Sequence, residues 1–278
     1  MCRKIKTVIS VFLITMIFNS AFAQKAIDNQ LIYRVLDARL STRQCKTSDE
    51  AIAKLDAFKA ELVKEGVLKN QNTEEELIIE NLINVERYSY MYEKDMKSEK
   101  LKPFILAQYD KINGFKDSHT DYDFSPWFIL SSGDVINSSM QFIPQATAIK
   151  QGLREKDEYD KVVKENPQMA FALINSALWY YFAPAIGGGS KTVAKEDFEN
   201  ALKYAKCNYE EFYSRVFLSQ IYYDEGKKEV CKAMLDECDK ILSDNVYIPF
   251  VRMLNDNGYS LLYYTINREK VDKKLNKN

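Results

Sequence analysis

The only histidine of the chain is the first place to look for chemistry. It lies in a polar stretch where every second residue could bind a metal ion: Asp117, His119, Asp121 and Asp123. A calcium-binding EF-hand loop would need glycine where Tyr122 stands and glutamate where Phe128 stands, so the sequence predicts a solvated loop and no metal. A Ser-His-Asp or Cys-His nucleophile would also have to be built around this histidine, and no nucleophile motif accompanies it.

Three consecutive glycines, Gly187 to Gly189, could bring backbone amides close to a phosphate. A Walker loop would need Gly-Lys-Ser/Thr at its end, and a dinucleotide loop would need a preceding strand, whereas the preceding segment has a helical pattern. The glycines therefore indicate a tight path between two helices. Anion binding by the amides before Ser190 stays open as the alternative. We expect no cofactor and no enzymatic activity.

Four cysteines lie beyond the first 23 residues: Cys45, Cys207, Cys231 and Cys238. Cys231 and Cys238 are two helical turns apart, about 10.5 Å along the axis, which is too far for a disulfide between them. A bond between Cys207 and Cys238 is geometrically plausible. The interpretation we favour is that Cys231 and Cys238 are free thiols that fill small positions in the core.

The first 23 residues have the pattern of a secretory signal peptide. Basic residues precede an apolar run, Thr7 to Phe18, which is too short to span a bilayer comfortably, and Ala21-Phe22-Ala23 supplies a cleavage site. We expect an exported, periplasmic or extracellular protein that begins at Gln24 and has no membrane span after cleavage. The alternative is an uncleaved N-terminal anchor.

The remaining residues, 24–278, have the composition of a single helical domain. Without the signal peptide the charge is near −4, because 36 basic residues stand against 40 acidic ones, and no basic excess points to nucleic acid. Apolar residues recur with helical spacing, and 9 Gly and 6 Pro are few for an all-β chain. We therefore predict an all-α fold.

Caps and breakers divide this domain into helices. Thr73 and the dipeptides Ser125-Pro126 and Asn166-Pro167 have the character of helix starts, and Gly66, Gly114 and Gly226 that of helix ends. A break is expected near Asn257-Gly258. The expected helices span residues 25–40, 49–65, 74–95, 103–114, 125 onward, 144–164, 167–182, 190–206, 209–225, 228–242 and 249–270, the first two forming a hairpin.

Two stretches, 167–206 and 209–242, share a spacing of small and apolar residues. Leu218, Ser219 and Tyr222 follow a Leu-Gly-x-x-Tyr pattern with serine in place of glycine. Small, apolar and small residues then recur at the same spacing in both stretches, at Ala194, Phe198 and Ala201 and at Cys231, Leu235 and Cys238. Small side chains on one helix face allow a neighbouring helix to approach closely.

This spacing resembles the tetratricopeptide repeat superfamily. The two sets lie 37 residues apart, against about 34 in the standard repeat. The segment from Pro184 to Phe198 is also similar to exported repeat proteins such as the TatT-type component associated with TRAP transporters. The resemblance implies an α-solenoid of four to five antiparallel helical pairs, closed by a C-terminal capping helix.

In this superfamily the first helix of each pair lines a concave groove that binds a protein or peptide. The resemblance implies that the groove is lined by Ser176, Trp179, Tyr213, Gln220 and Tyr223. The narrower resemblance implies a periplasmic solute-binding protein as the partner. Two other functions stay open: binding of a small ligand in an enclosed apolar pocket, and catalysis at an unrecognised site.

Overall fold

The structure is a computed structural model that describes residues 26–275, so the predicted signal peptide and its cleavage site lie outside the described residues. The described residues contain twelve α-helices and three short 3-10 helices, η1 (Thr42–Gln44), η2 (Met140–Phe142) and η3 (Ala185–Gly187), and no strand. The prediction of an all-α fold is confirmed. The α-helices are α1 (Asn29–Ser41), α2 (Ser48–Lys64), α3 (Glu74–Lys94), α4 (Leu101–Ser118), α5 (Pro126–Ser139), α6 (Gln145–Glu165), α7 (Ala170–Phe182), α8 (Lys191–Tyr204), α9 (Asn208–Asp224), α10 (Lys228–Ile241), α11 (Tyr247–Asp256) and α12 (Leu261–Leu275).

Several helix starts have side-chain caps, and two of these caps, Thr73 and Ser125, are expected from the sequence. The side chains of Thr73, Ser125 and Ser190 accept hydrogen bonds from amides in the first turns of α3, α5 and α8. Gly226 separates α9 from α10 with a positive φ of 78°, a conformation that glycine adopts without strain. The break at Gly258 divides the expected last helix into α11 and α12.

Several expected boundaries are wrong. The first helix begins at Asn29 rather than at residue 25. Gly114 does not end a helix, because α4 continues to Ser118. A glycine inside a helix costs only about 1 kcal/mol, and the extra turn places Phe115 against Phe128, with ring centroids 5.4 Å apart. Asn166-Pro167 does not start α7, which begins at Ala170. Asn166 instead ends α6, with its amide donating to Val162 O at 2.8 Å.

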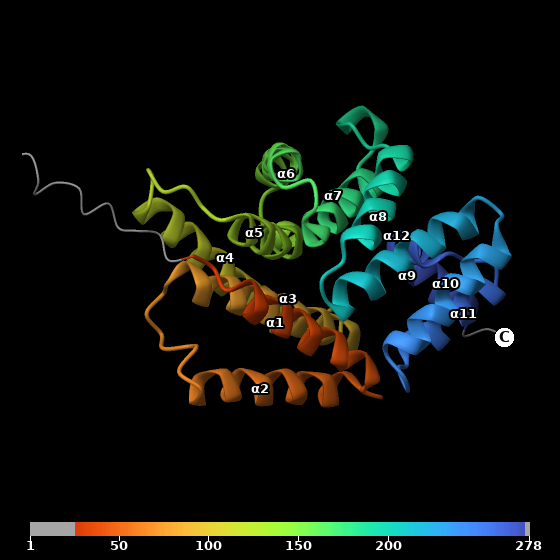
Figure 1. The fold of residues 1–278 in the computed structure, drawn as a ribbon, viewed down its shortest axis with the longest axis horizontal. Helices are drawn as coiled ribbons and strands as arrows, with labels where there is room; N and C mark the ends of the chain where they lie inside the picture. Colours follow the sequence, from red (N-terminus) through yellow and green to blue (C-terminus); the bar gives the residue numbers. More distant parts are fainter. Residues whose placement is uncertain (1–25, 276–278) are drawn as a thin grey trace, which may run out of the picture.

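Consecutive helices from α3 to α10 pack against one another, and the odd-numbered helices also contact each other in order, α3 to α5, α5 to α7 and α7 to α9 (Figure 1). In α8 and α10 the small and apolar positions face inward. Ala194, Phe198 and Ala201 are fully buried, and Cys231 and Cys238 are at most 3% exposed. Among the described residues, no helix is long and apolar enough to cross a bilayer.

Helix α1 joins the two ends of the helical array. It packs on α3 and also on α9, far along the chain, whereas it contacts α2 only slightly, and α2 packs mainly on α3 (Figure 1). The amide of Tyr209 donates to Asp37 Oδ1 at 2.8 Å. Beyond η1, Gln44 Nε2 donates to Ser243 O at 2.9 Å. The first two helices are still neighbours, since Arg34 of α1 forms ion pairs with Glu61 and Glu65 at the end of α2, but each packs more closely on another helix.

Candidate functional site

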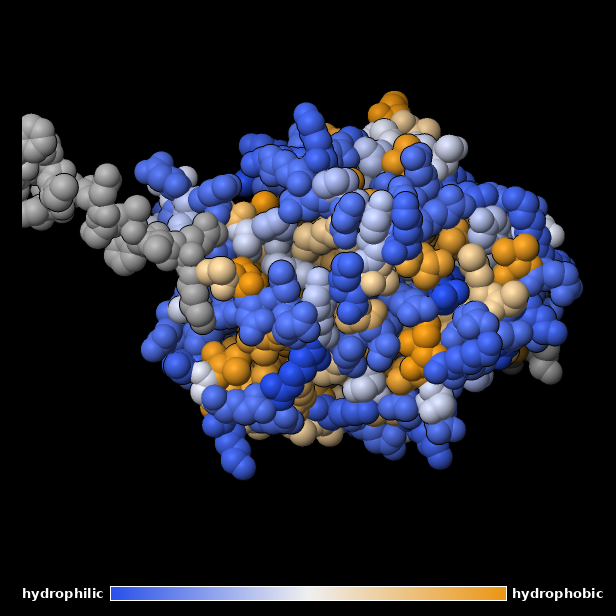
Figure 2. Space-filling view, in the orientation of Figure 1, coloured by the Kyte–Doolittle hydropathy of each residue, from blue (hydrophilic) through white to orange (hydrophobic). Residues whose placement is uncertain are grey.

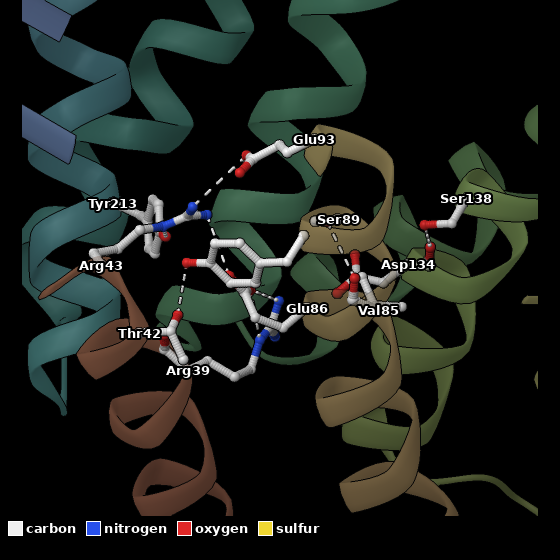
Figure 3. A network of polar contacts seen from close by, with 11 residues as sticks. Arg39, Thr42, Arg43, Val85, Glu86, Ser89, Glu93, Asp134, Ser138 and Tyr213 are labelled. Carbon is white, nitrogen blue, oxygen red and sulfur yellow. Dashed lines mark hydrogen bonds and ion pairs between the residues drawn. The ribbon is translucent and has the colours of Figure 1, made fainter. Parts of the chain in front are cut away.

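A buried ionic network lies where α1 and η1 meet α3 (Figure 3). Glu86 of α3 lies between two arginines, with Arg39 Nε 3.2 Å from Oε2 and Arg43 Nη2 3.2 Å from Oε1. The side chains of Glu86 and Arg39 are 5% exposed, and that of Arg43 is 14% exposed. Because charges out of water require partners, Glu86 holds α3 and the end of α1 together.

Tyrosines from α9 and α11 surround the two arginines. Arg43 Nε donates to Tyr213 Oη of α9 at 2.7 Å, and its guanidinium lies 4.7 Å from the ring centroid of Tyr247 in α11. Arg39 lies 5.0 Å from the ring centroid of Tyr209. Stacking of guanidinium groups on aromatic faces is favourable when water is excluded. We call Arg39, Arg43, Glu86, Tyr209, Tyr213 and Tyr247 the arginine–tyrosine centre.

A second set of titratable groups extends from this centre into α5 and α6. Burial raises the pKa of Asp134 to about 6, an effect that Arg39 opposes. Burial, followed by the negative charges of Asp134 and Glu158, raises the pKa of Glu155 to about 9. Asn137 opposes this shift, yet neither carboxylate oxygen of Glu155 makes a hydrogen bond of normal geometry. Glu155 is therefore a neutral carboxylic acid at pH 7.

Three cavities open at the edges of the described fold. Two of them, about 1230 and 760 Å³, lie where α1, α3, α5 and α7 begin. The third, about 360 Å³, lies at the other ends of α1 and α3, beside α11 and α12, and Arg43 forms part of its lining. Neither Asp134 nor Glu155 lines any of the three. A substrate in these cavities would not reach the two raised carboxyl groups.

Three of the five residues expected in a groove are inside the protein. Tyr213 belongs to the arginine–tyrosine centre, Gln220 is fully buried, and Ser176 is 2% exposed. The Gln220 oxygen accepts from the amide of Leu261 at 2.8 Å, and Ser176 Oγ donates to Asp197 Oδ2 at 2.7 Å. The expectation that these three side chains line an open groove is corrected, because the chain itself supplies their partners. Their role in binding stays a prediction that would require the chain to open.

The other two, Trp179 and Tyr223, are half-buried and reach the surface. Trp179 Nε1 donates to Gly152 O at 3.3 Å, and Lys156 Nζ lies 5.7 Å from its ring centroid. Similar lysine–tyrosine contacts continue across α8 to α9, where Lys195 Nζ lies 4.5 Å from the ring centroid of Tyr222. We call this area the aromatic–lysine surface, formed by Tyr181, Phe182, Ile186, Lys191, Lys195 and Tyr222. Trp179 and Tyr223 lie apart from it, against α6 and α11.

The glycine loop beside this surface has no amides to offer an anion. Gly187, Gly188 and Gly189 donate to Pro184 O or Ala185 O, and Ser190 donates to Tyr180 O, all at 2.8–3.1 Å. This corrects the alternative of an anion site. Gly188 has a φ of 96°, and a Cβ on Gly189 would stand 1.9 Å from Ala183 O, so the turn requires glycine at both positions.

Within the described residues, the histidine and the four cysteines form neither a metal site nor a disulfide. His119 Nδ1 lies 2.9 Å from Phe115 O, and its ring lies 4.2 Å from the Phe115 ring. Among residues 26–275, no three His, Cys, Asp or Glu side chains are grouped to hold a metal ion. All four described cysteines are free, and Cys238 Sγ faces Phe212 O at 3.7 Å rather than Cys207.

The local geometry therefore gives two candidates of different kinds, a closed polar centre and an exposed aromatic surface. Sequence reasoning missed the centre, because its members are charged residues and tyrosines without a common motif. Of the expected groove residues, Trp179 and Tyr223 reach the solvent, but they lie apart from the aromatic–lysine surface. No protein-family model matches the chain, and comparison with curated proteins finds no match either.

Proposed function

We propose that this chain is a non-enzymatic, exported helical-repeat protein of tetratricopeptide type that binds a protein partner. The small-residue faces of α8 and α10, both buried, support the repeat assignment. The proposed export is based on the pattern of residues 1–23. The narrower resemblance makes a periplasmic solute-binding protein of a transport system the first partner to test.

The observation that carries this proposal is the apolar tip of the aromatic–lysine surface. Ile186 is 99% exposed at the connection between α7 and α8, and Phe182, four residues earlier, is 37% exposed. Figure 2 shows hydrophobic atoms at the top of the molecule, over this connection. Hydrophobic residues that gather on a surface, with polar groups around them, are typical of a protein interface.

The tip is held in one conformation before any partner arrives. The amide of Gly187 donates to Pro184 O at 2.8 Å, and that of Ser190 donates to Tyr180 O at 2.9 Å. Tyr181 Oη also donates to Asp224 Oδ2 of α9 at 2.8 Å, which joins the end of α7 to α9. A preorganised surface loses little conformational entropy when it binds. Tyrosines beside it, such as Tyr181, offer large contact area with a polar group at one end.

The groove inferred from the family resemblance is less favourable as the binding surface. Helix α1 and the arginine–tyrosine centre occupy the space between α3 and α9, so a partner would have to displace buried ion pairs. The alternative of a small ligand in an enclosed apolar pocket has less support for the same reason, because this interior is charged.

The test is affinity capture of a partner from envelope extract, followed by a binding measurement with the purified partner. Ile186→Ser should reduce affinity about thirtyfold, since loss of a central interface anchor costs about 2 kcal/mol. Its melting temperature should stay unchanged because the side chain is in solvent. The matched control is Ile266→Ser on α12, where the isoleucine is 65% exposed. Equal affinities of both variants and the natural chain would rule out this surface.

A further inference from the structure

The 360 Å³ cavity lies where residues 42–48 meet the helices α11 and α12. One side comes from η1 and the residues after it, and the other from α11 and α12, with the end of α3 between them. The amide of Val246 donates to Arg43 O at 2.8 Å and fixes this junction. A volume of this size suits a small organic molecule.

Arg43 lines the cavity, and one of its three guanidinium nitrogens makes neither a hydrogen bond nor a close ion pair within the described residues. Its Nε donates to Tyr213 Oη, and its Nη2 faces Glu86. Its Nη1 makes no hydrogen bond to the described residues, and its ion-pair contact is Glu93 Oε1 at 4.0 Å, visible as the long dashed line in Figure 3. At this distance Glu93 is outside hydrogen-bond range of the nitrogen, so Arg43 Nη1 can donate to an anion that comes closer.

A second arginine lines the same cavity from α12. The side chain of Arg268 is 28% exposed, and its Nε, which is buried, has no hydrogen-bond partner among the described residues; its nearest ion-pair contact is Asp272 Oδ2 at 3.7 Å. With Lys46, the lining holds three cations, whereas Glu93 is its one carboxylate. The cavity therefore favours an anion.

The walls between the arginines are aromatic. The ring of Tyr90 lies 5.3 Å from the Arg43 guanidinium, and Tyr247 lies on the same group at 4.7 Å. Phe250 and Tyr264 meet edge to face with centroids 5.3 Å apart. Aromatic walls with two arginines are suited to a flat molecule with one planar acidic group, whose two oxygens can accept one charge-assisted hydrogen bond from each arginine.

We propose that this cavity binds a small aromatic carboxylate, with its acid group on Arg43 and Arg268 and its ring against the tyrosines of α3, α11 and α12. Such a ligand displaces Glu93 from Arg43, and the Glu93 side chain, 44% exposed, has room to turn into solvent. Because the walls come from both ends of the chain, the bound ligand also stabilises the closed fold.

The experiment uses phenylacetate and phenethylamine, two probes with the same ring and opposite charge, in calorimetry and thermal shift. Phenylacetate should bind and raise the melting temperature, whereas phenethylamine should do neither. Arg268→Gln should weaken phenylacetate binding about tenfold or more, since a charge-assisted pair is lost. Glu93→Gln should strengthen it severalfold, because it removes the competing carboxylate.

The matched control is Arg252→Gln on α11, whose guanidinium is already paired with Asp236 and Asp239 outside the cavity. This variant should bind phenylacetate as the natural chain does. The proposal is wrong if the folded natural chain fails to bind phenylacetate at millimolar concentration. Binding that Arg268→Gln and Glu93→Gln leave unchanged, or a preference for phenethylamine, would also overturn it.

Discussion

The buried faces of α8 and α10 hold Ala, Phe, Leu and Cys side chains, whereas the interior around Glu86 holds arginines and tyrosines. In the first region, helices that follow one another in the chain pack through small residues. In the second, the contacts join α1 to α9, 170 residues apart between Arg43 and Tyr213. The difference indicates that apolar packing builds neighbouring pairs, while the charged contacts determine which distant helices meet.

Removing the carboxylate at the arginine–tyrosine centre should have the largest effect. Glu86→Gln leaves Arg39 and Arg43 buried without a counter-charge, and breaking a buried pair in this way costs about 3–5 kcal/mol. Urea denaturation followed by circular dichroism measures this loss. The control is Glu61→Gln, which removes the partner of Arg34 at a surface where the Glu61 side chain is 54% exposed, and should cost under about 1 kcal/mol. Equal denaturation midpoints would mean that the centre is not stabilising.

The next prediction compares the loss of one tyrosine hydroxyl at each end of α9. Tyr213→Phe removes the acceptor of a buried arginine, so we expect a loss of about 1.5–3 kcal/mol in unfolding free energy. Tyr223→Phe removes a hydrogen bond of 2.6 Å to Asn255 O at the surface end, and should cost about 0.5–1.5 kcal/mol. Thermal and urea unfolding of both variants compare them directly. A larger loss from Tyr223→Phe would contradict the distinction between centre and surface.

The corresponding test of the apolar region is Ala201→Leu, which enlarges a side chain on the buried face of α8. Ala201 is fully buried in α8, and extra methylenes in a packed interior cost about 1–3 kcal/mol. Lys203→Leu, two residues along the same helix, is the control because Lys203 is exposed. The melting temperature should fall only for Ala201→Leu. Similar melting temperatures would show that this helix face tolerates larger side chains.

The last comparison concerns a dependence on pH rather than a single free energy. Glu155 has a folded pKa of about 9 against an ordinary value of 4.5, so between these values the folded chain binds more protons than the unfolded chain. Stability should therefore fall as pH rises, by at most about 1.4 kcal/mol per pH unit. Glu155→Gln should remove this slope, so its advantage grows from pH 5 to pH 8. Glu165→Gln, at an exposed position of α6, should keep the slope, and a parallel profile for Glu155→Gln would refute the assignment.

Local features of the fold could be predicted from the sequence because their causes are local. Thr73 and Ser125 cap helices through their own side chains, and Ala194 and Ala201 mark a face that a neighbour must approach. Gly114 misled the prediction, since packing of Phe115 on a residue further along the chain outweighed the preference of glycine for a helix end.

The groove could not be excluded from the sequence, because what fills it comes from another part of the chain. Asp37 and Tyr209 meet across 172 residues, and no spacing rule connects them. Tyr213 and Gln220 have the residue types of a binding surface, and these types also suit a polar interior. The exposure of Ile186 could not be predicted from helical periodicity, because this residue lies in the turn between α7 and α8.

The attachment of α1 to α9 has a consequence for the kinetics of folding. Contacts between residues distant in sequence slow folding because a long loop must close first. Chains grow at about 5–20 residues per second, so the roughly 170 residues from Arg43 to Tyr213 take about 10–30 s to synthesise. During this time the first helix cannot reach its final neighbour, and its buried arginines stay hydrated. Docking of α1 is therefore expected to be a late step of folding.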